Sequence, residues 1–206
     1  FGARLSRRGE PRGAVDAPDV SAEPIRVEAR ELDLAARRVV GRFRTTLRAE
    51  HRTFDFHDGE TEAGDEIDQD HRDRAVSRLS ARADYAVTPA LALFVQAATN
   101  RRDYRRAEGR DSAGVEALAG VDFELGALVR AQVAAGHVRQ AFDHPGVSDI
   151  EGLVASARVE WFPTPLTTVT LTGDQVVEEA ERVGAAGALT RRVGVALDHE
   201  LLRNLI

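Results

Sequence analysis

Strict two-residue alternation over most of the chain limits what this sequence can fold into more than any other feature. In residues 153–161, LVASARVEW, the odd positions are apolar, and the even positions include Ser156, Arg158 and Glu160. Farther on, threonines and Asp174 alternate with Val169 and Leu171. A period of two places successive side chains on opposite faces of a β-strand. The sequence therefore predicts strands that have one apolar face and one polar, charged face.

Turn signals divide the alternating runs at regular intervals. Proline cannot donate a hydrogen bond to a sheet ladder, so PTP at 163–165 indicates a tight turn between two strands. Short turns are predicted near Arg38–Gly41, Val87–Ala90, Leu125–Leu128, Phe162–Pro165 and Leu201–Asn204, and the last four lie about 37 to 39 residues apart. Longer polar connections are predicted between them, at 9–23, 57–70, 105–112, 143–148 and 178–186. This alternation is typical of an up-and-down barrel in an outer membrane.

The runs between these connections predict strands at 25–37, 42–56, 72–86, 90–104, 112–125, 128–142, 150–162, 165–177 and 188–200. Each exceeds the ~9–11 residues that a tilted strand needs to cross a bilayer, and no run of about 18 apolar residues offers a spanning helix. We expect an all-β fold, an antiparallel up-and-down transmembrane β-barrel with about ten strands in this chain. Residues 1–24 are assigned to the end of a preceding strand and an outer loop, and residues 25–206 to one barrel domain truncated at both ends.

Aromatic residues gather near the predicted strand ends. The group near the short turns is Phe43, Tyr85, Phe94, Phe123, Trp161 and Phe162, and the group near the long connections is Phe54, Phe56, Tyr104 and Phe142. A soluble sandwich would more often bury such rings in the middle of its strands. The distribution is typical of two aromatic girdles, one at each rim of a membrane barrel.

Composition narrows the classes of function. The net charge is -6, and the arginines are spread along the strands, which argues against a nucleic-acid partner. There is no cysteine, and Ser156 and His137 fall in opposite phases, so they cannot form a catalytic pair. The acidic segment 57–73 lacks the glycine and distal glutamate of an EF-hand loop, which favours a solvated loop over a calcium site. We expect no enzyme activity, no metal and no cofactor.

The candidate site residues lie in the polar phase of the strands. If that face lines a wet lumen, its charged side chains include Arg44, Arg48, Arg52, Arg74, Arg78, Arg82, Asp84, Arg130, Arg158 and Arg192. Two interpretations remain open. The arginines of 44–52 and 74–82 form a basic wall that attracts anionic solutes, or they pair with Glu50, Asp84, Glu116 and Asp122 in a lumen of mixed charge.

Five segments together resemble a known family. They are DEIDQDHRDR at 65–74, NRRDY at 100–104, VRQAFDHP at 138–145, PTPLTTVTL at 163–171 and DHELLRNL at 198–205. In order and spacing they are similar to the putative beta-barrel porin 2 family of bacterial outer-membrane proteins, and the likeness covers about residues 25–206. It implies a closed antiparallel barrel in a Gram-negative outer membrane and brings no catalytic residues. Some members are associated with exopolysaccharide export.

The resemblance and the polar phase together predict a role in the bacterial outer membrane. We expect a channel or export conduit that is surrounded by outer-membrane lipid. Its cargo would be polysaccharide or small solutes, and its partners would be periplasmic export components. The alternative is a non-transporting scaffold or adhesin barrel whose outer loops bind partners. Because the chain stops at NLI, where another strand should begin, and lacks a final strand ending in an aromatic residue, we interpret it as an internal segment of a larger barrel.

Overall fold

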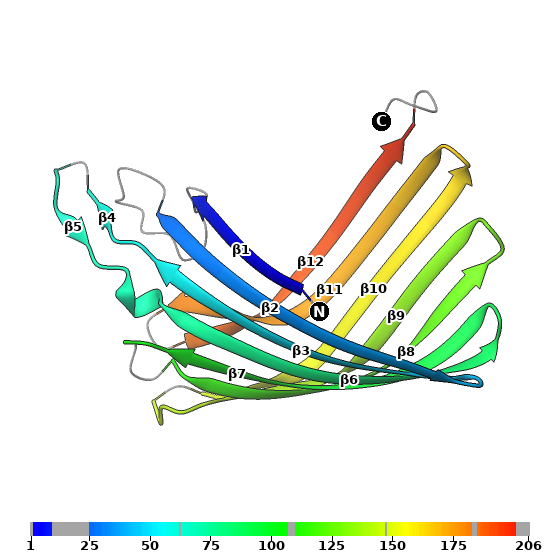
Figure 1. The fold of residues 1–206 in the computed structure, drawn as a ribbon, viewed down its shortest axis with the longest axis horizontal. Helices are drawn as coiled ribbons and strands as arrows, with labels where there is room; N and C mark the ends of the chain where they lie inside the picture. Colours follow the sequence, from blue (N-terminus) through cyan, green and yellow to red (C-terminus); the bar gives the residue numbers. More distant parts are fainter. Residues whose placement is uncertain are drawn as a thin grey trace.

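One curved antiparallel sheet makes up nearly all of the protein. The computed structural model describes residues 2–9, 25–61, 63–106, 110–146, 148–182 and 185–200. Ten long strands follow one another in nearest-neighbour order and bend into a trough that is open between its first and last strands (Figure 1). They are β1 (Gly2–Gly9), β2 (Arg26–Val40), β3 (Phe43–Phe56), β6 (Arg74–Thr88), β7 (Leu91–Tyr104), β8 (Ser112–Leu125), β9 (Val129–Phe142), β10 (Ile150–Thr164), β11 (Thr167–Arg182) and β12 (Ala185–His199). The predicted all-β, up-and-down architecture is confirmed, and the described sheet is not closed.

The connection between β3 and β6 holds the remaining elements. A two-stranded hairpin pairs β4 (Gly59–Glu60) with β5 (Glu66–Ile67), and the 3-10 helix η1 (Asp70–Arg72) follows it. Within the described ranges, no helix is long and apolar enough to cross a membrane.

The short turns all lie at one rim, on the right in Figure 1. Gly41 and Gly126 adopt φ of 59° and 57°, a left-handed conformation that glycine enters without steric cost. A carbonyl oxygen near each turn accepts an N–H from the next hairpin at 2.8–2.9 Å, which joins neighbouring turns. Both Thr-Pro turns therefore share the rim of Gly126, as predicted, and the acidic segment Asp58–Asp70 lies at the opposite rim. Arg203 and the turn predicted at Leu201–Asn204 lie outside the described residues.

The long connection predicted at 178–186 is wrong. The ladder between β11 and β12 continues through Glu178–Ala188 and Glu179–Gly187 and ends at the pair Arg182–Ala185, with an irregular register before that pair. The run of charges suggested a loop. The ladder is made by backbone N–H and C=O groups, so a run of charged side chains does not prevent the two strands from extending beyond the predicted ends.

The register separates the side chains into two faces. Asp84, Phe94, Gly120, Ala134 and Ser156 stand opposite one another across five strands and lie on the concave face. The neighbouring positions in each strand, such as Leu93, Val121 and Val133, lie on the convex face and are largely apolar. The two faces are those that the alternation in the sequence predicts. The convex set includes Val121, Val133, Val159, Val169 and Val195.

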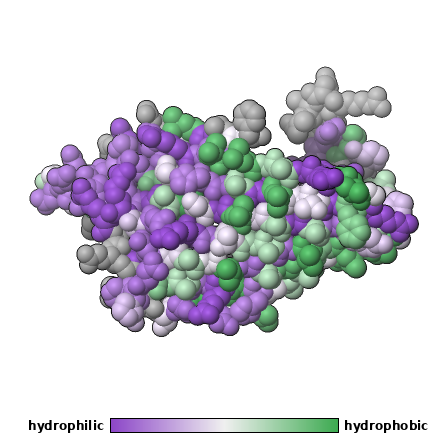
Figure 2. All heavy atoms as spheres, turned by 60° about the horizontal axis from the view of Figure 1, so that its bottom comes forward, coloured by the Kyte–Doolittle hydropathy of each residue, from purple (hydrophilic) through white to green (hydrophobic). Residues whose placement is uncertain are grey.

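Apolar side chains form a continuous band on the convex face. Figure 2, which looks at the underside of the trough, shows hydrophobic residues over its middle and polar ones gathered at its ends, most of them at the end of the long connections. The described residues of β6 and β8 place no charged side chain on this face at all. On β7, β9 and β10 the convex charges, such as Arg101, Arg139 and Glu151, come only near the long connections. Across β6 to β10 the band is therefore free of charge except near the long connections, while on β2 the convex residue Arg38 lies near the short-turn rim.

Three aspartates close the long connections in the same way. The carboxylates of Asp73, Asp111 and Asp149 accept the backbone N–H of the aromatic residue that ends the preceding long strand, at 2.8, 2.7 and 3.3 Å. Those aromatic residues are Phe56, Tyr104 and Phe142. The aspartates are spaced about 38 positions apart, the same interval as the short turns. We call these contacts the aspartate clamps. They show that the repeat in the sequence is a repeat of the hairpin itself.

The clamp at Asp73 is the most enclosed of the three. Its side chain is 3 % exposed and also accepts a hydrogen bond from the Arg105 guanidinium at 3.1 Å, while its carbonyl oxygen accepts the Arg105 N–H. Burial raises the pKa of the Asp73 carboxyl above its usual range, and the hydrogen bond from Phe56 opposes that rise only in part.

Because the folded-state pKa of Asp73 is raised, the folded protein binds this proton more tightly than the unfolded chain does. Its contribution to the free energy of unfolding therefore falls as the pH rises from the ordinary aspartate value through the raised pKa. We expect Asp73→Asn, which keeps an oxygen acceptor for Phe56 but carries no charge, to gain stability relative to wild type over that window. Denaturant unfolding at a series of pH values measures the difference. A difference that stays constant with pH would show that Asp73 does not titrate in this way.

Candidate functional site

The ten predicted site residues lie together on the concave face. The pairing across β3, β6, β9, β10 and β12 gives every one of them the same orientation as Asp84. They are Arg44, Arg48, Arg52, Arg74, Arg78, Arg82, Asp84, Arg130, Arg158 and Arg192. Ser156 also lies on this face, paired with Ala134, whereas His137 is paired with Leu153 on the convex face. The structure therefore does not bring this serine and this histidine together.

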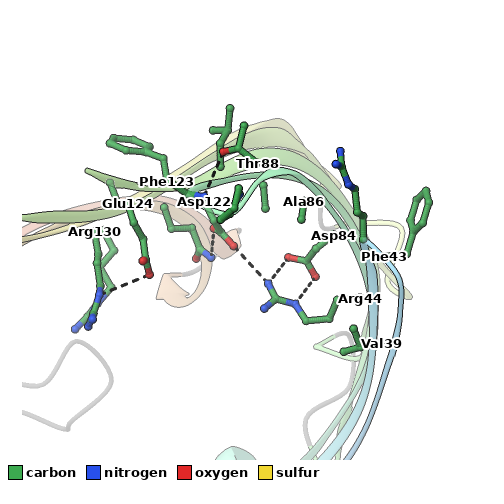
Figure 3. Close-up of a pocket in the computed structure, with 18 of the residues that line it drawn as sticks. Val39, Phe43, Arg44, Asp84, Ala86, Thr88, Asp122, Phe123, Glu124 and Arg130 are labelled. Atoms are coloured by element: carbon green, nitrogen blue, oxygen red, sulfur yellow. Dashed lines mark hydrogen bonds and ion pairs between the residues drawn. The ribbon is translucent and has the colours of Figure 1, made fainter. Parts of the chain in front are cut away.

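Arg82 forms the centre of a charged network in the trough. Figure 3 shows another member of this network, Arg44, directed at Asp84 and Asp122. The Nε and Nη2 atoms of Arg82 donate to Asp84 Oδ1 at 2.9 and 2.8 Å, and Nη2 also donates to Asp122 Oδ2 at 2.6 Å. The Arg82 side chain is 19 % exposed and that of Asp84 is 4 % exposed. A charge pair this enclosed is held by several hydrogen bonds at once, which compensates the loss of hydration.

The network extends to both sides of Arg82. Arg44 on β3 donates to both carboxylate oxygens of Asp84, at 3.2 and 2.8 Å, and its guanidinium lies 3.8 Å from Asp122. On β9, Gln132 Nε2 donates to Asp122 Oδ1 at 2.8 Å. Side chains from β3, β6, β8 and β9 are therefore linked in one row across the concave face, which we call the central network.

Phe94 on β7 contacts the central network through its aromatic ring. Its ring lies 3.6 Å from the Arg82 guanidinium carbon, a cation–π contact, and the ring itself is buried. A Cβ atom at Gly120 would collide with the Phe94 ring, so only glycine leaves room for it there. Sequence reasoning assigned Phe94 to an aromatic girdle and missed this role. The Gly-Phe pair across β7 and β8 was the available signal, but it is visible only once the register is known.

Six further concave arginines also lie beside carboxylates, whereas Arg74 donates to the Arg72 carbonyl oxygen at 3.2 Å. Arg78 is 2.8 Å from Glu116, Arg52 is 2.9 Å from Glu31, and Arg158 is 2.9 Å from Glu160. Looser pairs of 3.7–3.8 Å join Arg48 to Glu50, Arg130 to Glu124 and Arg192 to Asp174. This pattern favours a face of mixed charge over a basic wall.

A pocket of about 530 Å³ opens beside the central network, toward the short-turn rim. Its lining combines guanidinium donors, including Arg44 and Arg158, with carboxylate acceptors, including Asp122 and Glu160. The pocket therefore offers cationic and anionic groups in similar number at the place where the concave charges are most closely linked.

Among the described aromatic residues, the convex girdle lies at one rim and not at both. At the short-turn rim, Phe43, Tyr85, Phe123 and Trp161 are convex and exposed, and the rings of Phe43 and Tyr85 are 4.9 Å apart. At the other rim, Phe54, Phe56, Tyr104 and Phe142 occupy concave positions, and arginine guanidinium groups stack on the first three rings. The prediction of a girdle at each rim is wrong, because distance from a turn does not determine the face. The face is determined by whether the residue occupies an odd or an even position in the alternation of its strand.

The acidic carboxylates of the β3–β6 connection organise that segment. Asp58, Asp68 and Asp70 bring oxygen atoms within 4.8 Å of one another. Asp58 accepts the Gln69 N–H and Asp68 accepts the Asp70 N–H, both at 2.8 Å, while Asp70 pairs with Arg106. These contacts account for the positions of the three carboxylates as part of the loop.

Comparison with known proteins gives one match. A model of the putative beta-barrel porin 2 family matches residues 1–206, which is the entire chain. No curated protein and no solved structure matches it.

We expect neutralisation of a carboxylate to lower the free energy of unfolding more inside the central network than at an ion pair outside it. We expect Asp84→Asn to lower the free energy of unfolding by about 2–4 kcal/mol, because Arg44 and Arg82 would lose their shared charge partner in a poorly hydrated place. The matched change Glu160→Gln, at a more exposed pair, should cost about 0–1 kcal/mol. Urea unfolding of the protein in detergent micelles measures both. Equal costs would mean that the network adds nothing beyond ordinary surface pairing.

Proposed function

The chain belongs to the putative beta-barrel porin 2 family, and we propose that its concave face lines a water-filled passage through a bacterial outer membrane. The observation that carries the proposal is the separation of charge between the two faces. The concave face holds the central network and the other paired arginines, while the convex band is apolar between its polar ends. A strand with one lipid-facing and one water-facing side has this alternation.

The height of the convex band supports a membrane setting. On β10 the band runs from Leu153 to Trp161, which at ~3.3 Å per residue is about 26 Å along the strand. A strand tilt of about 35–45° reduces this to roughly 20 Å along the membrane normal, close to the ~25 Å apolar belt of outer-membrane barrels. Trp161 lies at the short-turn edge of the band, where an aromatic ring at the membrane–water interface is expected.

The opposite assignment of the faces would be costly. An arginine that faces lipid at the bilayer midplane costs about 2–4 kcal/mol, whereas an arginine in a wet lumen costs little. Arg48, Arg78 and Arg158 all lie on the concave face, part of the way along their strands. Three such penalties together would amount to about 6–12 kcal/mol, comparable with the whole stability of an ordinary domain, which supports the assignment of the concave face to water.

The pairing of charges on the concave face affects which solutes would pass through the proposed passage. Paired arginines and carboxylates offer many donors and acceptors but little net field, which suits neutral polyhydroxyl solutes, including segments of polysaccharide, better than small anions. In this proposal the short-turn rim faces the periplasm, where export components would contact it, and the role involves no covalent chemistry. A non-transporting scaffold or adhesin is the competing function, and it would show no conductance.

The face assignment predicts opposite outcomes for two neighbouring substitutions. We expect Val133→Arg to impair assembly into lipid, because it would place a charge in the convex band at a cost of about 2–4 kcal/mol. The adjacent change Gln132→Arg places the same side chain on the concave face and should assemble nearly normally. Heat-modifiable gel migration after reconstitution measures assembly. If both variants assembled equally well, the convex face would not meet lipid.

Channel recording tests transport itself. Arg78→Gln removes the partner that lies 2.8 Å from Glu116, so we expect the ratio of cation to anion permeability to rise roughly twofold, a modest change because a wide lumen screens one charge. Arg38→Gln, on the convex face near the short-turn rim, serves as the control and should not change the ratio. Absence of any conductance from correctly assembled protein would favour the scaffold function.

A further inference from the structure

Arginines stand directly beyond the apolar band, at its long-connection edge. On β2, β7, β9 and β12, the first convex residue with a permanent charge past the apolar run is Arg30, Arg101, Arg139 and Arg191, respectively. We call these four residues the arginine row. Their side chains are among the most exposed of those in ion pairs, at 71 % for Arg30, 66 % for Arg101 and 59 % for Arg139.

An acid lies on the far side of three of these arginines, away from the band. Arg101 donates to Asp103 at 2.8 Å, Arg139 to Asp149 at 3.1 Å, and Arg30 to Glu28 at 2.9 Å. In each case the acid is nearer to the long connections than the arginine is. On β2, β7 and β9 the order from the band outward is therefore apolar side chain, guanidinium and carboxylate, whereas on β10 the acid Glu151 comes first and pairs with Arg139 in the ladder.

These ion pairs use only part of each guanidinium. The group has five N–H donors. Arg101 donates to Asp103 through Nε, and Arg139 donates to Asp149 through Nη2. Both side chains are more than half exposed and lie on the convex face where the apolar band ends, so their remaining N–H groups are open to an acceptor from outside the protein. A planar donor group of this kind matches the oxygens of a phosphate better than those of water or a neutral ester.

The other edge of the band is built differently. At the short-turn rim the convex positions hold Phe43, Tyr85, Phe123 and Trp161, rings that suit an interface without requiring an anion. The two edges therefore differ in their main groups. Aromatic rings predominate at the short-turn edge, although Arg38 is also convex there, and the long-connection edge carries the arginine row together with the acids Glu151 and Asp55.

We propose that the arginine row binds the phosphate groups of lipid headgroups in the leaflet next to the long connections. The proposal rests on the proposed membrane function, since it requires lipid against the convex band. The acyl chains would cover the apolar side chains of the band, and the phosphates would contact Arg101 and Arg139 at its long-connection edge. The occupant is a phosphate-bearing lipid because the charge and the apolar surface are continuous on this face.

Retention of lipid by the folded protein tests the proposal. Native mass spectrometry of the protein in detergent, with lipid A added, counts the molecules that stay bound. We expect Arg101→Gln combined with Arg139→Gln to reduce the lipid-bound fraction several-fold, and Arg139→Gln alone to reduce it by a smaller factor. Arg158→Gln is the matched control, because its side chain is 58 % exposed but concave, and its lipid-bound fraction should equal that of wild type.

The lipid itself provides the second arm of the experiment. Dephosphorylated lipid A has the same acyl chains, and the wild-type protein should retain it no better than the double variant retains lipid A. Equal retention of lipid A by wild type, double variant and control would overturn the proposal, as would equal retention of the two lipids. Channel recording of the same double variant keeps this result apart from the membrane function. Normal conductance with unchanged lipid retention contradicts only the arginine row, whereas failure of all forms to enter lipid contradicts the membrane function.

Discussion

The pairing of strands residue by residue is the constraint on which the other features of this protein depend. In a sheet, a shift of one residue in the register moves every side chain of a strand to the opposite face. Here the pairing runs from β2 to β12 with register shifts only near strand ends, so that Arg48 and Arg158, far apart along the sheet, face the same side. The concave charges, the convex band and the arginine row all follow from this consistent register of strand pairing.

The central network strengthens the same register through side chains. Arg44, Asp84, Arg82 and Asp122 join hairpins that are about 40 positions apart in sequence, and the Phe94 ring fills the space left by Gly120 beneath them. These contacts form only if the register of β7 with β8 is the observed one, because a shift of one residue would move Phe94 to the convex face. The network therefore stabilises the curvature and the register together, and places paired charges toward the proposed passage.

The two rims of the sheet are built differently. At the short-turn rim, tight turns bonded to one another and a convex aromatic girdle give a compact edge. At the other rim, the aspartate clamps fasten longer connections to the ends of the strands, so that loops of different length start from equivalent positions. This asymmetry is common in outer-membrane barrels, where the long connections face outward and vary while the strands do not.

The sequence alone determined most of the long strands, their faces and the shared rim of the short turns that the structure describes, because alternation, proline and glycine act within a few residues. It did not determine the ends of β11 and β12, where it predicted a loop. Only the tertiary structure decided which neighbours meet. The sequence left open whether the concave arginines form a basic wall or pair with acids, because Arg82 and Asp122 come together through two hairpins and not through spacing. It placed Phe56, Tyr104 and Phe142 in a girdle because it measured distance from a loop, whereas the ladder assigns them to the concave face. Contacts across strands depend on register, and register is a property of the whole sheet.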